Sequence, residues 1–295
     1  MSAALEGKES PASRRGLPIG EGALDFAGLT LDRPLIMGVI NVTPDSFSDG
    51  GEAFHPAAAL ERGRTMVEAG AAILDVGGES TRPGAEPVSE DDELARVLPV
   101  VRGLAEQGAV VSIDTRRAAV MEAATGAGAR IINDITALSG DPRSMEVAAA
   151  SDAHLILMHM RGEPGTMQDD PHYEDAPREV LDYLAGRVAA CEAAGIDRRR
   201  IAVDPGIGFG KTLDHNIEIL RRLDLYRELG LPLVLGVSRK SLIAEMARGE
   251  PPQARLPGSL AAALAGVSRG VHILRVHDVA ETRQALEVWA AIETV

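Results

Sequence analysis

The chain has 295 residues, 45% of them hydrophobic and 25% charged, which is an ordinary composition for a globular protein. Its formal net charge of -14 argues against a nucleic-acid-binding surface, because neutralising phosphates requires clustered Lys and Arg; a small anionic ligand can still bind in a local basic pocket. The single cysteine, Cys191, excludes an internal disulfide, and no apolar run is long enough to predict a membrane span.

The first segment of the chain is predicted to lie outside the fold. Residues 1–22 are rich in Ser, Ala, Gly and charge, and they have no hydrophobic periodicity. We expect a flexible tail without the apolar core of a secretory signal, and hence a cytoplasmic protein that binds no membrane. Residues 23–295 are then predicted to form one domain. It begins with a short hairpin, 24–31, that turns at Gly28 and plugs one end of the fold.

Short apolar runs rich in β-branched residues recur after Pro34, and each ends in polar residues. We predict strands over 35–40, 72–76, 109–113, 130–133, 153–158, 201–203, 233–237 and 271–276. We predict helices over 56–70, 89–107, 116–127, 143–151, 175–195, 213–229, 257–269 and 278–293, with a shorter helix over 239–248. This alternation favours an α/β fold of the (β/α)8 TIM-barrel type, with long loops after strands 1 and 2, over an open doubly wound sheet.

Polar residues at the strand ends should converge, because every strand of such a barrel points its C-terminal end to the same face. These residues are Asn41, Asp75, Asp114, Asn133, His159, Asp204, Ser238, Arg239, Lys240, Arg275 and His277. The carboxylates of Asp114 and Asp204 and the amide of Asn133 suit a flat heterocycle with adjacent N–H donors and a carbonyl. The alternative is that these three side chains cap the helices that follow them.

Cationic and N–H groups gather after the last two predicted strands, at 239–240 and 275–277. In this fold the corresponding loops commonly hold phosphate, so we favour a phosphate or pyrophosphate site over a solvated charge cluster. The glycine-rich segment 204–211 lacks the spacing of a nucleotide-triphosphate loop. We interpret it as a tight turn that brings backbone close to the ligand, with Phe209 as a stacking face.

The loops over 41–51 and 77–84 combine glycine and proline with acids, an aromatic residue and an arginine. We interpret them as lids rather than ordinary surface loops. Dispersed histidines argue against catalytic zinc. A Mg²⁺ ion held mainly by ligand phosphates could take one oxygen from Asn41.

Three long segments of the sequence resemble the dihydropteroate synthase family. They are MGVINVTPDSFSDGG at 37–51, LDVGGESTRPG at 74–84 and ILRVHD at 273–278. The shorter segments SIDT (112–115), NDI (133–135), MHM (158–160), DPGIGFGK (204–211) and SRK (238–240) follow in that family's order. The resemblance covers roughly residues 24–293.

The resemblance implies a folate-pathway transferase that joins 4-aminobenzoate to 6-hydroxymethyl-7,8-dihydropterin diphosphate and releases pyrophosphate. It also implies Mg²⁺ as cofactor, inhibition by sulfonamides, and a homodimer. By position, it assigns catalysis to Lys240, Asp45 and Arg82; pterin binding to Thr81, Asp114, Asn133, Asp204 and Lys240; pyrophosphate binding to Asn41, Arg275 and His277; 4-aminobenzoate binding to Phe47, Pro83, Phe209 and Ser238; and Mg²⁺ to Asn41.

Two other functions are considered. A catalytically silent pterin-binding paralogue would bind pterin without turnover, whereas the predicted site residues are all present. A methyltetrahydrofolate methyltransferase-like domain would share acidic and amide pterin contacts but would lack the pyrophosphate clamp. Such a methyltransferase should neither require Mg²⁺ nor release pyrophosphate.

Overall fold

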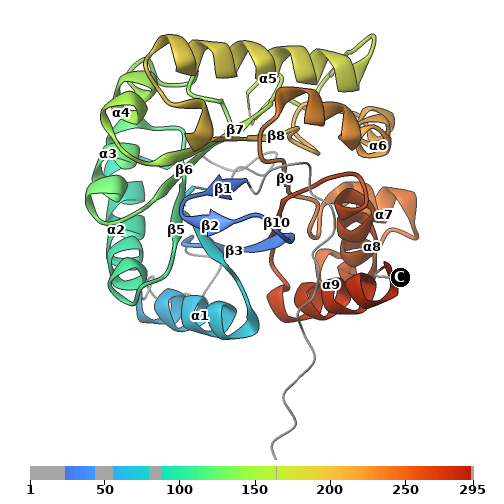
Figure 1. Cartoon of the computed structure of the whole chain (residues 1–295), viewed down its shortest axis with the longest axis horizontal. Coiled ribbons are helices and arrows are strands. Elements are labelled where there is room, and N and C mark those ends of the chain that lie inside the picture. Colours follow the sequence, from blue (N-terminus) through green and yellow to red (C-terminus); the bar gives the residue numbers. More distant parts are fainter. Residues whose placement is uncertain (1–23, 44–55, 80–87, 164, 294–295) are drawn as a thin grey trace, which may run out of the picture.

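A closed parallel β-barrel forms the centre of the computed structural model, which describes residues 24–43, 56–79, 88–163 and 165–293 (Figure 1). Its strands within these ranges are β3 (Leu35–Asn41), β4 (Ile73–Gly77), β5 (Val111–Asp114), β6 (Ile131–Asp134), β7 (His154–Met158), β8 (Ile201–Asp204), β9 (Val234–Leu235) and β10 (Ile273–Val276). They pair in the order β8-β7-β6-β5-β4-β3-β10-β9. A bridge between Val203 and Leu233 closes the ring, which excludes the open-sheet alternative.

Helices surround the barrel on its outside (Figure 1). Those in the described ranges are α1 (Pro56–Ala69), α2 (Glu90–Glu106), α3 (Ala118–Gly126), α4 (Ser144–Ala150), α5 (Ala176–Ala193), α6 (Leu213–Arg221), α7 (Ser241–Met246), α8 (Leu256–Val267) and α9 (Val279–Glu293). The eight predicted strand–helix units are confirmed, with boundaries that shift by a few residues. Short strands fit the buried runs between helices, because both faces of a parallel sheet are covered.

One predicted helix, 213–229, is wrong as a single element. Helix α6 ends at Arg221, and a 3₁₀ helix, η3 (Leu223–Leu229), follows it. Three residues spaced three apart, Leu223, Tyr226 and Leu229, are buried in η3. Residues at this spacing share one face of a 3₁₀ helix, which has three residues per turn, so the apolar spacing suits the tighter helix.

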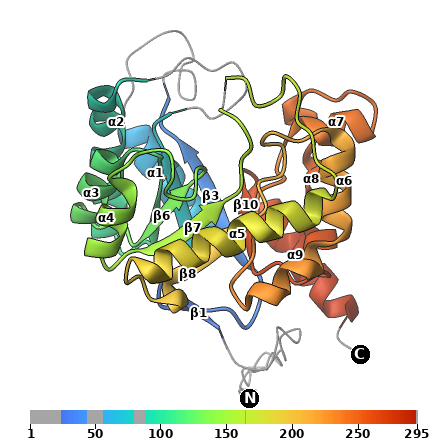
Figure 2. The same cartoon turned by 90° about the horizontal axis from the view of Figure 1, so that it is seen from above.

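The predicted N-terminal hairpin forms and closes one end of the barrel. Strands β1 (Asp25–Phe26) and β2 (Leu29–Thr30) pair antiparallel, and Figure 2 shows β1 below the barrel strands. Phe26 and Leu31 pack in one cluster with inward-facing strand residues. These include Met37, Ile73, Ile131, Ile156, Ala202, Val234 and Ile273. Because these apolar side chains fill one end of the barrel, the opposite end is the one available to polar groups.

A second and larger core fills the layer between the strands and the helices. Within the described ranges, no helix combines the length and the hydropathy that a membrane span requires. The predicted tail, 1–22, lies outside the described residues. So do 44–55 and 80–87, which include most of the two predicted lids.

Candidate active site

Four strand ends bring a carboxylate pair, an amide and a guanidinium together at the barrel mouth. Arg275, on β10, donates from Nε to Oδ2 of Asp75 and from Nη2 to Oδ2 of Asp114, at 2.6 Å each. Asn133 on β6 donates from Nδ2 to the same oxygen of Asp75, at 3.2 Å. The predicted convergence of Asp114, Asn133 and Arg275 is therefore observed.

The capping alternative does not describe these side chains. Helix α3, which follows Asp114, has Arg117 at its N-cap, without a side-chain capping bond. The Asn133 amide contacts Asp75 instead of a helix end. Oδ1 of Asp204 accepts from the backbone N–H of Gly206 at 2.7 Å, within the turn after β8. Each polar group is thus held at the mouth of the barrel.

Burial and charge pairing set the protonation of this cluster. Burial raises the pKa of Asp114 to about 7, and Asp75 adds to the rise, while Arg275 opposes it. Burial also raises the pKa of Asp204, against the lowering effect of the Lys240 ammonium. Desolvation disfavours the Arg275 charge, yet the Asp75 and Asp114 carboxylates outweigh it and raise its pKa. The mouth therefore holds acids that accept protons readily beside a permanent cation.

Asp75 is the member of this cluster that the sequence analysis noted at a strand end but did not assign to a ligand. Its side chain is fully buried on β4, and its Oδ1 has no hydrogen-bond partner among the described residues. An unpaired buried carboxylate oxygen is costly and indicates a missing donor, such as water or a ligand N–H. The sequence feature that could have identified Asp75 as a site residue is its position in a predicted strand whose C-terminal end lies at the barrel mouth.

Lys240 follows β9 and reaches across to the glycine-rich segment. Its Nζ donates to the carbonyl of Ile207 and lies 4.6 Å from the centroid of the Phe209 ring. Burial lowers the pKa of Lys240 to about 8, although Asp204 opposes the shift. The cation therefore lies against the predicted stacking face.

A left-handed backbone turn places Lys240. Arg239 has a φ of 60°, which is unusual for a residue with a side chain. Its N–H donates to Ser259 Oγ at 2.9 Å, its carbonyl accepts from Arg255 at 2.9 Å, and its guanidinium pairs with Asp278. The guanidinium of Arg239 is paired with Asp278. We therefore assign the predicted phosphate binding to the neighbouring groups and not to Arg239.

The segment after β8 makes the tight turn that the sequence predicts. Gly206 and Gly210 have φ values of 67° and 61°, in the left-handed region. A Cβ at Gly206 would overlap with the carbonyl oxygen of His159, and one at Gly210 would overlap with that of Arg161. Both positions therefore require glycine for conformation and for space.

His277 and Ser238 contact each other beside the cluster. Ser238 Oγ lies 3.0 Å from His277 Nδ1 and accepts from the His277 backbone N–H at 3.2 Å. Burial and then Arg275 lower the pKa of His277 to about 4, so the imidazole is neutral at pH 7. His277 also lines a groove of about 310 Å³ between α1 and the start of α9, together with Arg62. No sequence motif marked Arg62.

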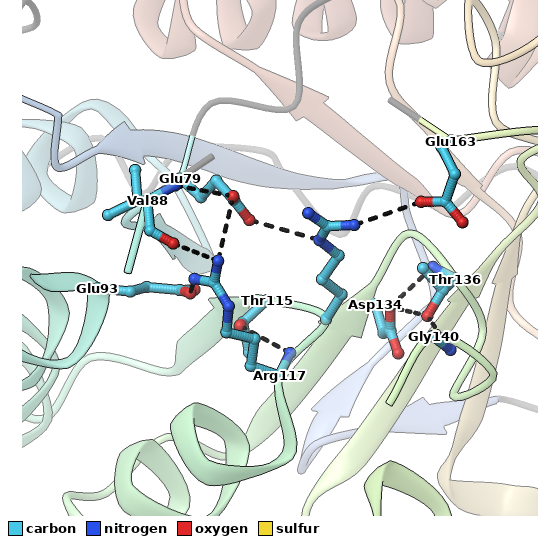
Figure 3. Close-up of polar contacts among 10 residues, drawn as sticks. Glu79, Val88, Glu93, Thr115, Arg117, Asp134, Thr136, Gly140 and Glu163 are labelled. Carbon is cyan, nitrogen blue, oxygen red and sulfur yellow. Dashed lines mark hydrogen bonds and ion pairs between the residues drawn. The ribbon is translucent and has the colours of Figure 1, made fainter. Parts of the chain in front are cut away.

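A second polar network joins Arg117 to residues on either side of segment 80–87 (Figure 3). Arg117 contacts the carboxylates of Glu79 and Glu93 and the carbonyl of Val88, and the N–H of Val88 donates to Glu79 Oε1 at 3.2 Å. Burial raises the pKa of Glu93 despite this partner. Glu79 and Val88 border the segment 80–87, which includes most of the predicted second lid, 77–84, so Arg117 joins the described residues on either side of that segment.

Asp134 also appears in this view, and its role is local. Its Oδ1 accepts from the backbone N–H and the hydroxyl of Thr136, at 2.7 Å each (Figure 3). Its Oδ2 accepts from the N–H of Leu138 at 2.9 Å. These contacts shape the turn after β6. The carboxylate therefore supports the neighbouring Asn133 without joining the cluster.

Several predicted site residues lie outside the described residues. They are Asp45, Phe47, Thr81, Arg82 and Pro83. Asn41 ends β3 and is half-buried. His159, predicted at the mouth, is buried and contacts Lys211 instead. No group of three or more His, Cys, Asp or Glu side chains suited to a metal occurs in the part of the chain that the structure describes.

Comparison with known proteins adds an independent line of evidence. The family model for pterin binding enzymes matches residues 37–277. The chain is 48% identical to the dihydropteroate synthase of Escherichia coli K12 over 261 residues, which covers 88% of this chain and 92% of the relative.

Solved structures agree with the sequence comparison. The dihydropteroate synthase of Xanthomonas albilineans, solved with 4-aminobenzoic acid, superposes with a TM-score of 0.86 at 48% identity, covering 92% of this chain and 98% of that one. The Yersinia pestis enzyme, solved as a sulfonamide drug complex, gives a TM-score of 0.87 at 44% identity, covering 93% and 100%.

Proposed function

Because this chain belongs to the pterin-binding enzyme family, and within it to the dihydropteroate synthases, we propose that it makes 7,8-dihydropteroate for folate biosynthesis. The substrates would be 4-aminobenzoate and 6-hydroxymethyl-7,8-dihydropterin diphosphate. The observation that supports this proposal best is the cluster of Asp75, Asp114, Asn133 and Arg275 at the barrel mouth.

The cluster suits a pterin on chemical grounds. A pterin edge offers several N–H donors beside a carbonyl, and carboxylates accept such donors in pairs. Asp114 and Asp204 would accept from the ring, and the unpaired Oδ1 of Asp75 could accept a further N–H. Asn133 and Lys240 supply donors for the ring's acceptors. Thr81, which is also predicted here, lies outside the described residues.

The reaction exchanges a C–O bond for a C–N bond. The bond between the methylene carbon and the diphosphate breaks, and its electron pair leaves with pyrophosphate. The lone pair of the aniline nitrogen then forms the new bond, and the nitrogen loses a proton. The dihydropterin ring can stabilise the positive charge that develops on the methylene carbon. Positive groups near the leaving oxygens favour this departure.

Arg275 and His277 are the described groups that would receive the pyrophosphate. Arg275 keeps its charge at all working pH values, whereas neutral His277 contributes an N–H. Arg62 lines the same groove as His277 and would add a further cation on that side of the site. Phe209 and Ser238 remain candidates for 4-aminobenzoate, as do Phe47 and Pro83 among the undescribed residues. Asp45 and Arg82 remain catalytic candidates outside those residues.

Covalent catalysis by cysteine has no support. Cys191 is buried in α5, and burial raises the pKa of its thiol to about 11, which leaves it protonated at pH 7. The proposed displacement needs no enzyme nucleophile, since the diphosphate is already a good leaving group.

A Mg²⁺ ion fits the described residues only as an ion held largely by its substrate. Asn41 offers one carbonyl oxygen at the end of β3, and the described residues contain no acidic cluster that could complete a coordination shell. Mg²⁺ commonly binds through few protein oxygens plus phosphates and water. When bound, it would neutralise charge on the departing pyrophosphate.

Three further parts of the proposal follow from the resemblance. By analogy with the Yersinia pestis enzyme, which was solved with a sulfonamide, we expect sulfonamides to compete with 4-aminobenzoate. A folate-pathway role supports a cytoplasmic location. A homodimer is expected, and light scattering coupled to size-exclusion chromatography would measure it.

The proposed activity has a direct test. Purified protein is incubated with the pterin diphosphate, with and without 4-aminobenzoate and Mg²⁺, and both pyrophosphate and dihydropteroate are measured. Equal amounts of the two products, dependent on both additions, are expected. Pterin binding without either product would instead identify a silent paralogue. A separate assay with methyltetrahydrofolate, in which a methyl group is transferred without Mg²⁺ and without pyrophosphate release, would point to the methyltransferase class.

A further inference from the structure

Lys211 ends the glycine-rich segment and is buried, with 3% of its surface exposed. Its Nζ donates to the carbonyls of Gly206 at 2.8 Å and Phe209 at 3.0 Å, and lies 2.8 Å from Nδ1 of His159. The described contacts of this ammonium are thus made within the protein. The function proposed above gives Lys211 no role.

We propose that Lys211 and His159 are positioning residues for the pterin subsite. The buried ammonium–imidazole pair would fix the segment 205–210 to the end of β7, and so hold Asp204, Phe209 and Lys240 in the arrangement that receives the ligand. This proposal deepens the proposed function and rests on it for the identity of the ligand.

The shape of the segment depends on side chains to an unusual degree. Carbonyls in helices and strands are normally satisfied by regular backbone bonds, but each carbonyl of residues 206–210 accepts from a side chain, and that of Gly206 also accepts from the backbone N–H of Phe209 at 3.1 Å. The carbonyls of Gly206 and Phe209 accept from Lys211, that of Ile207 from Lys240, that of Gly208 from Gln168 at 2.7 Å, and that of Gly210 from Tyr173 at 2.8 Å. Lys211 is the one side chain in this set that holds two of the carbonyls.

The pair reaches Asp204 by two routes. The backbone N–H of His159 donates to the carbonyl of Asp204 at 3.0 Å, while the N–H of Gly206 donates to its Oδ1 at 2.7 Å. Lys211 holds the carbonyl of that same Gly206. Releasing Lys211 would therefore loosen the Gly206–Ile207 peptide, which directly follows the peptide whose N–H orients the Asp204 carboxylate, and leave the Gly206 carbonyl with only its 3.1 Å bond from the Phe209 N–H. It would also remove the bond to the carbonyl of Phe209, whose ring faces Lys240.

The contacts of Lys211 set the direction of its hydrogen bond to His159. Burial and then the Lys240 charge lower the pKa of Lys211 well below its usual value, while Asp204 opposes the shift. In its charged form Lys211 has three N–H groups and no lone pair, so Nδ1 of His159 is the acceptor. Burial and then the Lys211 charge lower the pKa of His159 to about 2, which keeps the imidazole neutral and able to accept. The Lys211 Nζ thus has two carbonyls and one ring nitrogen within 3.0 Å, and the carbonyl of His159 lies at 3.4 Å. Tyr183 packs edge-on against the His159 ring, with 4.9 Å between centroids, and fixes its plane.

The first test replaces Lys211 by Met, which retains the length of the side chain and removes its donors. The matched control is Arg200→Met, because Arg200 lies at the opposite end of β8 and donates to the carbonyls of Ala153 and Ala148. Calorimetry with 6-hydroxymethylpterin measures Kd, and hydrogen–deuterium exchange follows residues 204–211. We expect Lys211→Met to weaken binding about tenfold or more and to speed exchange in this segment. Arg200→Met should lower Tm without either effect.

A second pair of variants covers the case in which Lys211→Met does not fold. His159→Phe keeps a ring but loses the acceptor, whereas His159→Gln retains an acceptor oxygen. His159→Phe should weaken pterin binding in the same direction as Lys211→Met, and His159→Gln should restore most of the affinity. Equal Kd values for His159→Phe and the wild type would overturn the proposal, as would equal loss in both His159 variants.

Failure of the proposed function would be visible separately. If the wild type binds no 6-hydroxymethylpterin, the assigned ligand is wrong, yet the exchange measurement still tests the support of the segment 205–210. Faster exchange in Lys211→Met or His159→Phe, but not in Arg200→Met, would uphold the positioning role. Unchanged exchange would refute it.

Discussion

Replacing Arg275 by Met should destabilise the protein strongly at pH 8 and weakly at pH 5. The guanidinium bridges Asp75 and Asp114 at 2.6 Å each, and the Asp75 side chain is fully buried. Removing one partner of a buried ion pair leaves an uncompensated charge and typically costs about 3–5 kcal/mol. We expect a loss in this range at pH 8, where Asp114 of the wild type, with a pKa of about 7, is largely ionised.

The pH dependence follows from the carboxyl group of Asp114. Burial raises its pKa to about 7 even with Arg275 in place, and loss of the guanidinium would raise it further. When a carboxyl binds its proton more tightly in the folded than in the unfolded chain, the free energy of unfolding falls as the pH rises from about 4 through the folded pKa. In the wild type this decline ends near pH 7, whereas in Arg275→Met it continues to higher pH. The difference in stability between the two proteins must therefore grow from pH 5 to pH 8.

Urea denaturation followed by circular dichroism at both pH values measures the two differences. Arg283→Met is the control, since Arg283 forms an exposed helical ion pair with Glu287 that should contribute only about 0.3–0.5 kcal/mol. A loss of equal size at pH 5 and pH 8 would show that Arg275 stabilises the fold by packing rather than by neutralising acids. A loss at pH 8 no larger than that of the control would refute the buried ion pair.

The remaining predictions concern the ligand site and the barrel plug. Pterin affinity should fall as the pH falls through about 7, because ligand N–H donors need an ionised Asp114; Asp114→Asn should remove this dependence from a Kd-versus-pH titration. Lys240→Ala should raise the Kd for pterin about 10-fold or more by removing a charged donor, and unchanged kinetics would contradict its assignment. Phe26→Ala should lower the free energy of unfolding by about 3–5 kcal/mol and leave the pterin KM unchanged, because the ring fills the far end of the barrel. Gly206→Ala should abolish pterin binding through its overlap with the carbonyl of His159; normal binding by calorimetry would show that the turn can shift.

The barrel itself could be predicted because its signals are local and repeated. Each strand is a short apolar run between amphipathic helices, and the count alone favours closure. The break within 213–229 could not be predicted by that approach, since a three-residue spacing at Leu223, Tyr226 and Leu229 also fits one face of an α-helix. Packing against the barrel selects between the two helix types.

Only those residues of the candidate site that lie at strand ends could be predicted from the sequence. Asp114, Asn133 and Asp204 follow from that rule, but the rule does not say which side chain turns inward. His159 ends a strand in the same way, yet it is buried against Lys211. Arg275 was predicted to bind pyrophosphate, and the structure shows it held by two carboxylates. Such pairings depend on contacts across more than 100 residues of sequence, which motifs do not encode.

The ion pairs of Arg275 also bear on how a diphosphate ester could bind. Arg275 compensates two acids that would otherwise repel each other at the barrel mouth. A pterin that brings N–H donors to Asp114 replaces part of this compensation, and its diphosphate offers Arg275 a stronger anionic partner. On binding, Asp114 and Arg275 then exchange one partner for another, and neither charge is left unpaired. This exchange reduces the free-energy cost of desolvating a buried anion. A pterin without the diphosphate cannot complete this exchange, so it should bind more weakly than the diphosphate ester, and the difference should shrink in Arg275→Met.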